Sequence, residues 1–323
     1  MNSEGTYGRY GLGSNPFREL TSDNIRAIDL MHVDQEIDEE LNALREEIQE
    51  SESKAVVAIL GPLGAGKTER LLLFREWAKQ EGLMCIFEDV TLDANGLLLR
   101  ICESLIKKSK EGGFIKGFST PKWYKELQKA EKRSRKEYDP ERVATAIAAA
   151  LNNTVPSLLL LNDLHNLKES PEMDRFFQTI QVTMNKIDPG VLIMMSSNYS
   201  DFVHFIDRNR SLEQRINRAI MVSGLKDKEA ALLLAKRMAA RRLVEDLDPL
   251  YPFSMESISI INEIAEGNPR QLLRYSSIVI EKAAKKKHSR IEKDTVMSIL
   301  DELNEEDTLL IPKDRNVEEM SMA

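Results

Sequence analysis

The 323-residue sequence is poor in cysteine and histidine and has no long apolar run. Two cysteines, Cys85 and Cys102, are too few for a disulfide framework and lack the spacing of a metal site. The four histidines are scattered, which argues against a metal centre. No run approaches the roughly 18 apolar residues of a transmembrane helix, and the first residues do not resemble a secretory signal. We therefore expect a soluble, cytoplasmic protein.

The net charge of −8 argues against a generally basic protein that coats nucleic acid. The charge is unevenly distributed, because residues 1–53 carry 13 acidic and 4 basic side chains, and residues 301–323 carry 8 acidic and 2 basic ones. The body between these ends is net basic and can present a basic face.

Short apolar runs alternate with helical patterns through the first two thirds of the chain, at 55–60, 84–87, 158–161, 191–195 and 219–222. Such runs, separated by helices, are typical of a parallel sheet covered on both faces. From about residue 226 only helical patterns remain, over roughly 227–241, 255–266, 270–286 and 292–304. The predicted fold class is α/β, followed by a small all-α domain.

Residues 61–68 match the pattern G-x-x-x-x-G-K-[ST] in full, as Gly61, Pro62, Leu63, Gly64, Ala65, Gly66, Lys67 and Thr68. Glycines let backbone N–H groups surround a phosphate, and the following helix begins with partial positive charge. Lys67 would reach the β- and γ-phosphates, and the Thr68 hydroxyl would bind Mg²⁺. The alternative is a glycine-rich turn with a chance lysine, but a strand precedes the motif and a helix follows it. The motif therefore predicts an ATP and Mg²⁺ site.

Polar residues follow two later strands. Asn162 and Asp163 end the run 158–161, where a phosphate-loop protein places the acids that direct the metal and polarise water. Asn198 follows 191–195 and could hold the attacking water or the γ-phosphate. Arg215 precedes the last strand, and Arg270 lies in Gly267-Asn268-Pro269-Arg270, which opens a helix.

This order of motifs resembles the AAA+ P-loop ATPases, with Walker A at 61–68, Walker B at 158–163, sensor 1 at Asn198, a box VII arginine at Arg215 and sensor 2 at Arg270. Within that superfamily the chain is most similar to archaeal origin-recognition, initiator-type ATPases. The segment from Tyr10 to Phe17 also looks like the start of ExeA-type ATPases.

The resemblance implies a five-stranded parallel sheet of order 5-1-4-3-2, a helical lid, and Mg-ATP as the ligand. It implies catalytic roles for Lys67, Asp163, Asn198, Arg215 and Arg270, and metal binding by Thr68, Asn162 and Asp163. Arg270 would reach the γ-phosphate, and Arg215 would act on the nucleotide of a neighbouring subunit, so an oligomer is expected. The implied domains are a linker and acidic helix (1–50), the nucleotide-binding domain (51–224), the lid (225–304) and an acidic tail (305–323).

Two departures from the family pattern bear on function. Asn162 and Asp163 stand where Asp-Glu is usual, which removes one charge near the metal and sets the second carboxylate back by one methylene. About twenty residues follow Asn304, too few for the winged-helix domain that initiator proteins carry there. The first departure leaves slow hydrolysis or a binding-only switch open, and the second weakens the case for duplex binding.

Seven basic residues lie within the segment 111–137, at Lys122, Lys125, Lys129, Lys132, Arg133, Arg135 and Lys136. Beside Trp123 and Tyr124 they could bind nucleic acid, although the favoured interpretation is a solvated helix whose lysine stems cover apolar surface. Three hypotheses follow. The first is an ATPase that drives assembly or remodelling of a partner complex, the second a nucleotide-gated scaffold with little turnover, and the third a DNA-binding replication or recombination factor.

Overall fold

The structure, a computed structural model, describes residues 6–18, 31–91, 93–115, 120–167, 171–244 and 246–305. The chain forms two compact units, one of residues 34–223 and the other of residues 1–33 together with 224–323. Of the acidic tail expected over 305–323, residues 306–323 lie outside the described part of the chain.

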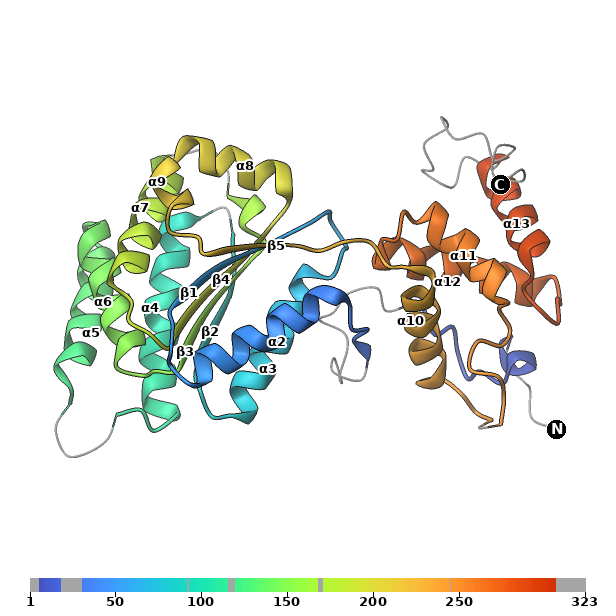
Figure 1. Ribbon diagram of the computed structural model, residues 1–323, viewed down its shortest axis with the longest axis horizontal. Coiled ribbons are helices and arrows are strands. Elements are labelled where there is room, and N and C mark those ends of the chain that lie inside the picture. Colours follow the sequence, from blue (N-terminus) through green and yellow to red (C-terminus); the bar gives the residue numbers. More distant parts are fainter. Residues whose placement is uncertain are drawn as a thin grey trace. The chain divides into compact units, whose positions relative to one another are not determined.

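The unit of residues 34–223 alternates strands and helices along the chain (Figure 1). Its strands are β1 (Ala55–Leu60), β2 (Met84–Asp89), β3 (Ser157–Asn162), β4 (Val191–Ser197) and β5 (Arg218–Met221). Its helices are α2 (Glu36–Gln49), α3 (Lys67–Gln80), α4 (Ala94–Glu111), α5 (Lys122–Ser134), α6 (Pro140–Asn152), α7 (Pro171–Lys186), α8 (Tyr199–Arg208) and α9 (Arg210–Glu213), with a 3-10 turn η3 (Leu164–Asn166).

The five strands form one sheet in the order β2-β3-β4-β1-β5, and every neighbouring pair is parallel. The expected fold class is therefore confirmed, as is the strand order that the resemblance implies. Because all strands run the same way, their carboxyl ends share one edge of the sheet, which is where ligands bind in α/β folds.

Both faces of the sheet are buried, which explains the continuous apolar runs. Successive side chains of a strand point to opposite faces. In β3, Leu158 and Leu160 pack in a core with α2 and α3, whereas Leu159 and Leu161 pack in a core with α4, α6 and α7. Figure 1 shows α2 and α3 on one side of the sheet and α4, α6 and α7 on the other. The predicted elements do not include α7, although its apolar residues have helical spacing.

The second unit is helical and contains α10 (Asp227–Ala239), α11 (Met255–Ile264), α12 (Pro269–Lys285) and α13 (Lys293–Glu305). Pro269 is the first residue of α12, and the Asn268 side chain accepts from the N–H groups of Arg270 and Gln271. Asn268 and Pro269 together fix where the helix starts. Proline has no N–H group that would need a partner in the first turn, and the asparagine side chain caps the N–H groups of the next two residues. No helix of the described residues is both long and apolar enough to cross a membrane.

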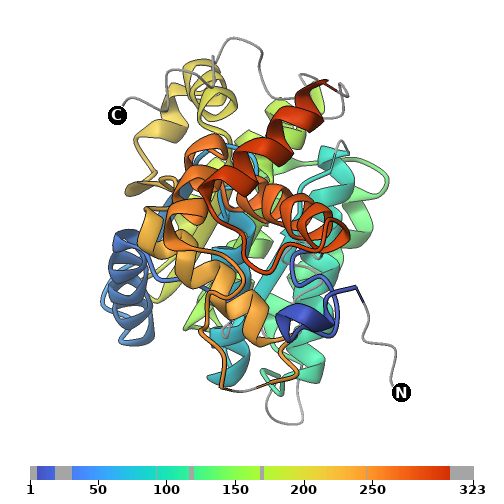
Figure 2. The same cartoon turned by 90° about the vertical axis from the view of Figure 1, so that its right-hand side faces the viewer.

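The N-terminal residues pack onto the helical unit (Figure 2, blue against orange and red). The short 3-10 helix η1 (Gly8–Tyr10) leads into this contact. The Tyr10 hydroxyl donates to the carbonyl oxygen of His288 at 2.9 Å, and Asn15 Nδ2 donates to Ser277 Oγ at 3.0 Å. The predicted boundaries group residues 1–50 together, whereas compactness divides this segment after Val33.

We expect both cysteine thiols to be unreactive in the folded protein. Burial raises the pKa of Cys85 from 9.0 to about 11, and it raises that of Cys102 to about 12. Since the thiolate is the nucleophile, a pKa two units higher lowers the reactive fraction at pH 8 about 100-fold. Labelling with a maleimide should be slow in buffer and complete in guanidinium; fast labelling of either thiol in buffer would contradict the packing.

Candidate functional site

A glycine-bearing loop joins β1 to α3 at the carboxyl edge of the sheet. Gly64 and Gly66 have φ angles of +85° and +94°, in the left-handed region that favours glycine. A Cβ on Gly61 would lie 3.0 Å from the carbonyl oxygen of Val222. The loop leads directly into the first turn of α3, whose free N–H groups and positive dipole end attract anions.

Lys67 is the first residue of α3 and is 4% exposed. Its Nζ donates to the carbonyl oxygens of Gly61 and Pro62, both at 2.9 Å, and to Asn198 Oδ1 at 3.4 Å. Lys67 and Asn198 meet because β1 and β4 are neighbours and both end at this edge. Two of the predicted site residues are thereby brought together, 131 positions apart in the sequence.

Thr68 and the two residues that end β3 form a second group at the same edge. Thr68 Oγ1 donates to Asn162 Oδ1 at 3.0 Å, and Ser196 Oγ donates to the same oxygen at 2.9 Å. Ser196 Oγ also accepts from the backbone N–H of Asp163 at 2.8 Å. Asp163 has φ +59°, an uncommon value for a residue other than glycine. The three predicted metal ligands, Thr68, Asn162 and Asp163, therefore lie together.

Asp89 lies beside this group and is not among the predicted site residues. It ends β2 and is the register partner of Asn162 in β3. Asn162 Nδ2 donates to Asp89 Oδ1 at 2.8 Å and to Asp163 Oδ2 at 3.1 Å. The acidic end of β2 was visible in the sequence, but its neighbour could be known only from the strand order.

A buried ion pair ties the first turn of α3 to the start of α2. Arg70 donates through Nε to Asp38 Oδ1 at 3.1 Å and through Nη2 to Asp38 Oδ2 at 2.9 Å. The same guanidinium donates to Gln35 Oε1 at 2.7 Å and to the carbonyl oxygen of Gly66 at 3.4 Å. The Arg70 and Asp38 side chains are 3% and 9% exposed. Through the bond of Arg70 to the Gly66 carbonyl oxygen, this ion pair stabilises the loop. It could not be predicted from the sequence, because its members are 32 residues apart.

The two predicted arginines come from other elements of the chain. Arg215 follows α9, and its guanidinium donates to Asn185 Oδ1 at 2.6 Å and to the carbonyl oxygen of Ser211. Arg270 is the second residue of α12 and belongs to the helical unit. The roles of both at a nucleotide stay predictions.

All seven predicted DNA-binding cations are exposed, on α5 or directly after it: Lys122, Lys125, Lys129, Lys132, Arg133, Arg135 and Lys136. The helix buries its other side through Tyr124, Leu127 and Ala130. Two of the cations pair with acids: Lys129 with Glu126 at 2.8 Å, and Arg135 with Glu131 and Glu103. The helix is therefore amphipathic with a basic outer face.

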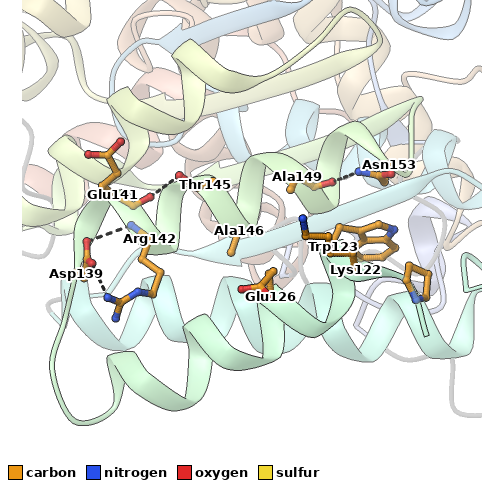
Figure 3. A pocket seen from close by; sticks show the side chains of 11 residues that line it. Lys122, Trp123, Glu126, Asp139, Glu141, Arg142, Thr145, Ala146, Ala149 and Asn153 are labelled. Carbon is orange, nitrogen blue, oxygen red and sulfur yellow. Dashed lines mark hydrogen bonds and ion pairs between the residues drawn. The ribbon is translucent and has the colours of Figure 1, made fainter. Parts of the chain in front are cut away.

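A groove of about 830 Å³ runs between α5 and α6 (Figure 3). Trp123 and Lys122 line it from α5, and Ala146 and Ala149 form part of its apolar wall on α6. Its charged residues have both signs, namely Lys122, Arg142, Glu126, Asp139 and Glu141. The groove is thus of mixed charge, whereas the outer face of α5 is mainly positive.

No protein-family model matches this sequence, and no curated sequence does. Solved structures do match. The Orc2 protein of Aeropyrum pernix, in ADPNP–ADP complexes, is 13% identical with TM-score 0.55 over 93% of this chain and 75% of that chain. The Orc1 protein of the same organism, in complex with DNA, is 14% identical with TM-score 0.52 over 87% and 69%. The Thermotoga maritima RuvB Holliday junction branch migration motor is 16% identical with TM-score 0.51 over 92% and 76%. At such identities the likeness concerns the fold.

Proposed function

The chain has the fold of the AAA+ P-loop ATPases and resembles the archaeal initiator-type members, and from this premise we propose that it binds Mg-ATP in the loop 61–68 and hydrolyses it. One observation carries the proposal. The loop ends with a buried Lys67 beside Asn198 and with Thr68 bonded to Asn162, all at the carboxyl edge of a parallel sheet. That edge and a helix N-terminus are where phosphates bind.

Each side chain has a proposed role. The Lys67 ammonium, now held by loop carbonyls, would donate to the β- and γ-phosphates. The Asn198 amide, 3.4 Å from it, would orient the attacking water. Asp163, held by the Asn162 amide, would accept the proton of that water. Arg270 and Arg215 would stabilise charge on the transferred phosphoryl group, Arg215 from a neighbouring subunit.

The donor set suits magnesium. Thr68, Asp163 and Asp89 bring one hydroxyl and two carboxylates together around the Asn162 amide, and Mg²⁺ prefers such hard oxygen ligands. Thr68 and Asp163 are the residues we assign to hold it directly, whereas Asn162, the third predicted ligand, would act through its hydrogen bonds to both. When bound with the nucleotide, magnesium neutralises phosphate charge.

Titration calorimetry with ATP, ADP and GTP at millimolar Mg²⁺ tests the binding step. We expect saturable binding of adenine nucleotides, with a Kd that rises when EDTA removes the metal. Absence of heat with any nucleotide would contradict the proposal. Tight ATP binding without phosphate release over hours would instead favour the nucleotide-gated scaffold, for which Asn162 in place of an aspartate is the supporting observation.

A second proposed function is binding of a nucleic-acid backbone by the outer face of α5. Its support is the row of exposed cations, of which Lys125, Lys132, Arg133 and Lys136 form no ion pair with another described residue. Phosphate contacts of this kind need no base recognition. We further propose a cytoplasmic protein that forms homo- or hetero-oligomers through Arg215.

Charge reversal on α5 tests this surface. Changing Lys125, Lys132, Arg133 and Lys136 to glutamate should abolish a salt-dependent gel shift of labelled DNA, because these contacts to phosphate would supply the affinity. Each lost contact also reduces the magnitude of the slope of log K against log salt by about 0.9 for duplex DNA. The matched control is the same reversal of Lys285, Lys286, Lys287 and Arg290, which are equally exposed at the end of α12. Equal DNA affinity of the α5 variant and the α12 control would contradict the proposal that α5 contacts DNA.

A further inference from the structure

The side chain of Asn162 joins four partners at the carboxyl edge of the sheet. Its Oδ1 accepts from the hydroxyls of Thr68 and Ser196, and its Nδ2 donates to the carboxylates of Asp89 and Asp163. The residue is buried, with 3% of its surface exposed, so these four bonds take the place of hydrogen bonds to water. Asn162 is therefore a bridge between the phosphate-loop threonine and the end of β2.

The chemistry of the partners settles which end of the amide faces which way. Carboxylates only accept hydrogen bonds, so the group facing Asp89 and Asp163 has to be the NH₂. A hydroxyl can donate, so Thr68 and Ser196 suit the carbonyl oxygen. A reversed amide would set its oxygen 2.8 Å from a carboxylate oxygen of Asp89. The Oδ1 atom of Asn162 therefore belongs on the Thr68 side.

This arrangement gives a physical reason for asparagine at position 162. An aspartate there would place a third carboxylate about 3 Å from two others, and like charges so close raise each other's pKa and destabilise the fold. The negative charge that the family pattern has at position 162 is instead present one strand away, on Asp89. An amide at position 162 with a carboxylate at position 89 has the same total charge as a carboxylate at 162 with an amide at 89.

Asp89 is also free to act on a cation. Its side chain is exposed, and no other described side chain bonds to its carboxylate. The guanidinium of nearby Arg100 donates through Nη2 to the backbone carbonyl oxygen of Asp89 at 3.5 Å and to Thr91 Oγ1 at 3.0 Å. Its Nε lies 3.5 Å from Glu88 Oε2, so its ion pair is with Glu88 and not with the Asp89 carboxylate. The described residues of this unit thus form no ion pair with the Asp89 carboxylate.

We propose that Asp89 supplies the carboxylate charge that favours a divalent cation beside Thr68, with Asn162 as the neutral bridge that positions both. This inference deepens the proposed function and rests on it. Asp89 is a positioning residue in this account, since it acts on the Thr68 side of the site through Asn162. The carboxylate charge at this edge is thereby shared between β2 and β3, whereas the family pattern places it on β3 alone.

A carboxylate–amide exchange tests the inference with two readouts. The variants are Asp89→Asn, Asn162→Asp and the double exchange, with Asp188→Asn as an exposed control before β4, at the opposite edge of the sheet. The first readout is the ratio of ADP affinity with and without Mg²⁺, by calorimetry. The second is the Tm without metal or nucleotide.

We expect Asp89→Asn to lower the Mg²⁺-dependent gain in ADP affinity by 10- to 100-fold, the usual effect of removing a carboxylate that supports a metal ligand. Affinity measured in EDTA should stay unchanged. Asn162→Asp should lower the Tm by about 2–8 °C through carboxylate repulsion. The double exchange should recover the Tm and most of the Mg²⁺ effect, since it restores one carboxylate–amide pair.

The outcomes separate the inference from the function it rests on. If wild type binds no nucleotide, the proposed function fails. If wild type binds ADP with help from Mg²⁺ and Asp89→Asn keeps the full gain, the inference is overturned and the function stands. A double exchange as unstable as Asn162→Asp also overturns it, because the two sites then do not interact. The control should match wild type in both readouts.

Discussion

Replacing Lys67 by alanine is expected to lower ATP turnover about 100- to 1000-fold, the usual effect of removing one preorganised donor to a developing negative charge. In the folded chain the ammonium is already held at the loop by the carbonyl oxygens of Gly61 and Pro62. It therefore needs no large rearrangement to meet a phosphate. The measurement is phosphate release at saturating ATP, together with ATP affinity.

A matched lysine lies on the same helix. Lys79, near the end of α3, is exposed and pairs only with Glu76 among the described residues, so Lys79→Ala should leave turnover unchanged. Circular dichroism should confirm that both variants are folded. Equal turnover in wild type and Lys67→Ala would remove the enzymatic claim, whatever the nucleotide affinity.

Replacing Asp38 by alanine is expected to destabilise the α/β unit by about 3–5 kcal/mol, because it leaves the buried Arg70 guanidinium without its carboxylate. Two charge-assisted bonds, at 2.9 and 3.1 Å, are lost at once. Unfolding in urea, followed by circular dichroism, gives the free energy of unfolding. Nucleotide affinity should fall as well, since Arg70 also bonds the carbonyl oxygen of Gly66 in the loop.

The neighbouring Glu39→Ala serves as the control, because Glu39 is exposed on the same turn of α2. Combining Asp38→Ala with Arg70→Met should recover much of the lost stability, since no unpaired charge is then buried. An Asp38→Ala variant as stable as Glu39→Ala would mean that the ion pair contributes nothing.

Much of the site could be predicted from local sequence. The loop 61–68 is contiguous, and its pattern alone placed Lys67 and Thr68 at the start of a helix. Asn162, Asp163 and Asn198 could be predicted because each lies within three residues of the end of an apolar run, and parallel strands share their carboxyl edge. In these cases the signal lies within a few residues of the candidate side chain.

The partners of those residues could not be predicted in the same way. Asp89 meets Asn162 only because β2 lies next to β3, and Asp38 meets Arg70 only because α2 packs on the face that α3 covers. The hydrogen bond from the Tyr10 hydroxyl to the His288 carbonyl oxygen joins residues 278 positions apart, and no periodic pattern in the sequence indicates it. The resemblance implied the strand order, but strand register and helix placement depend on the packing of the whole core and not on neighbouring residues.

The amino-acid sequence alone determined the α/β class, the phosphate loop and the helical character of the last part of the chain, because hydrophobic period and glycine pattern act over one or two turns. Only the tertiary structure decided that an amide at position 162 is matched by a carboxylate at position 89. Strand register brings those two side chains to 2.8 Å, and a hydrogen bond of that length exists only once the sheet has formed.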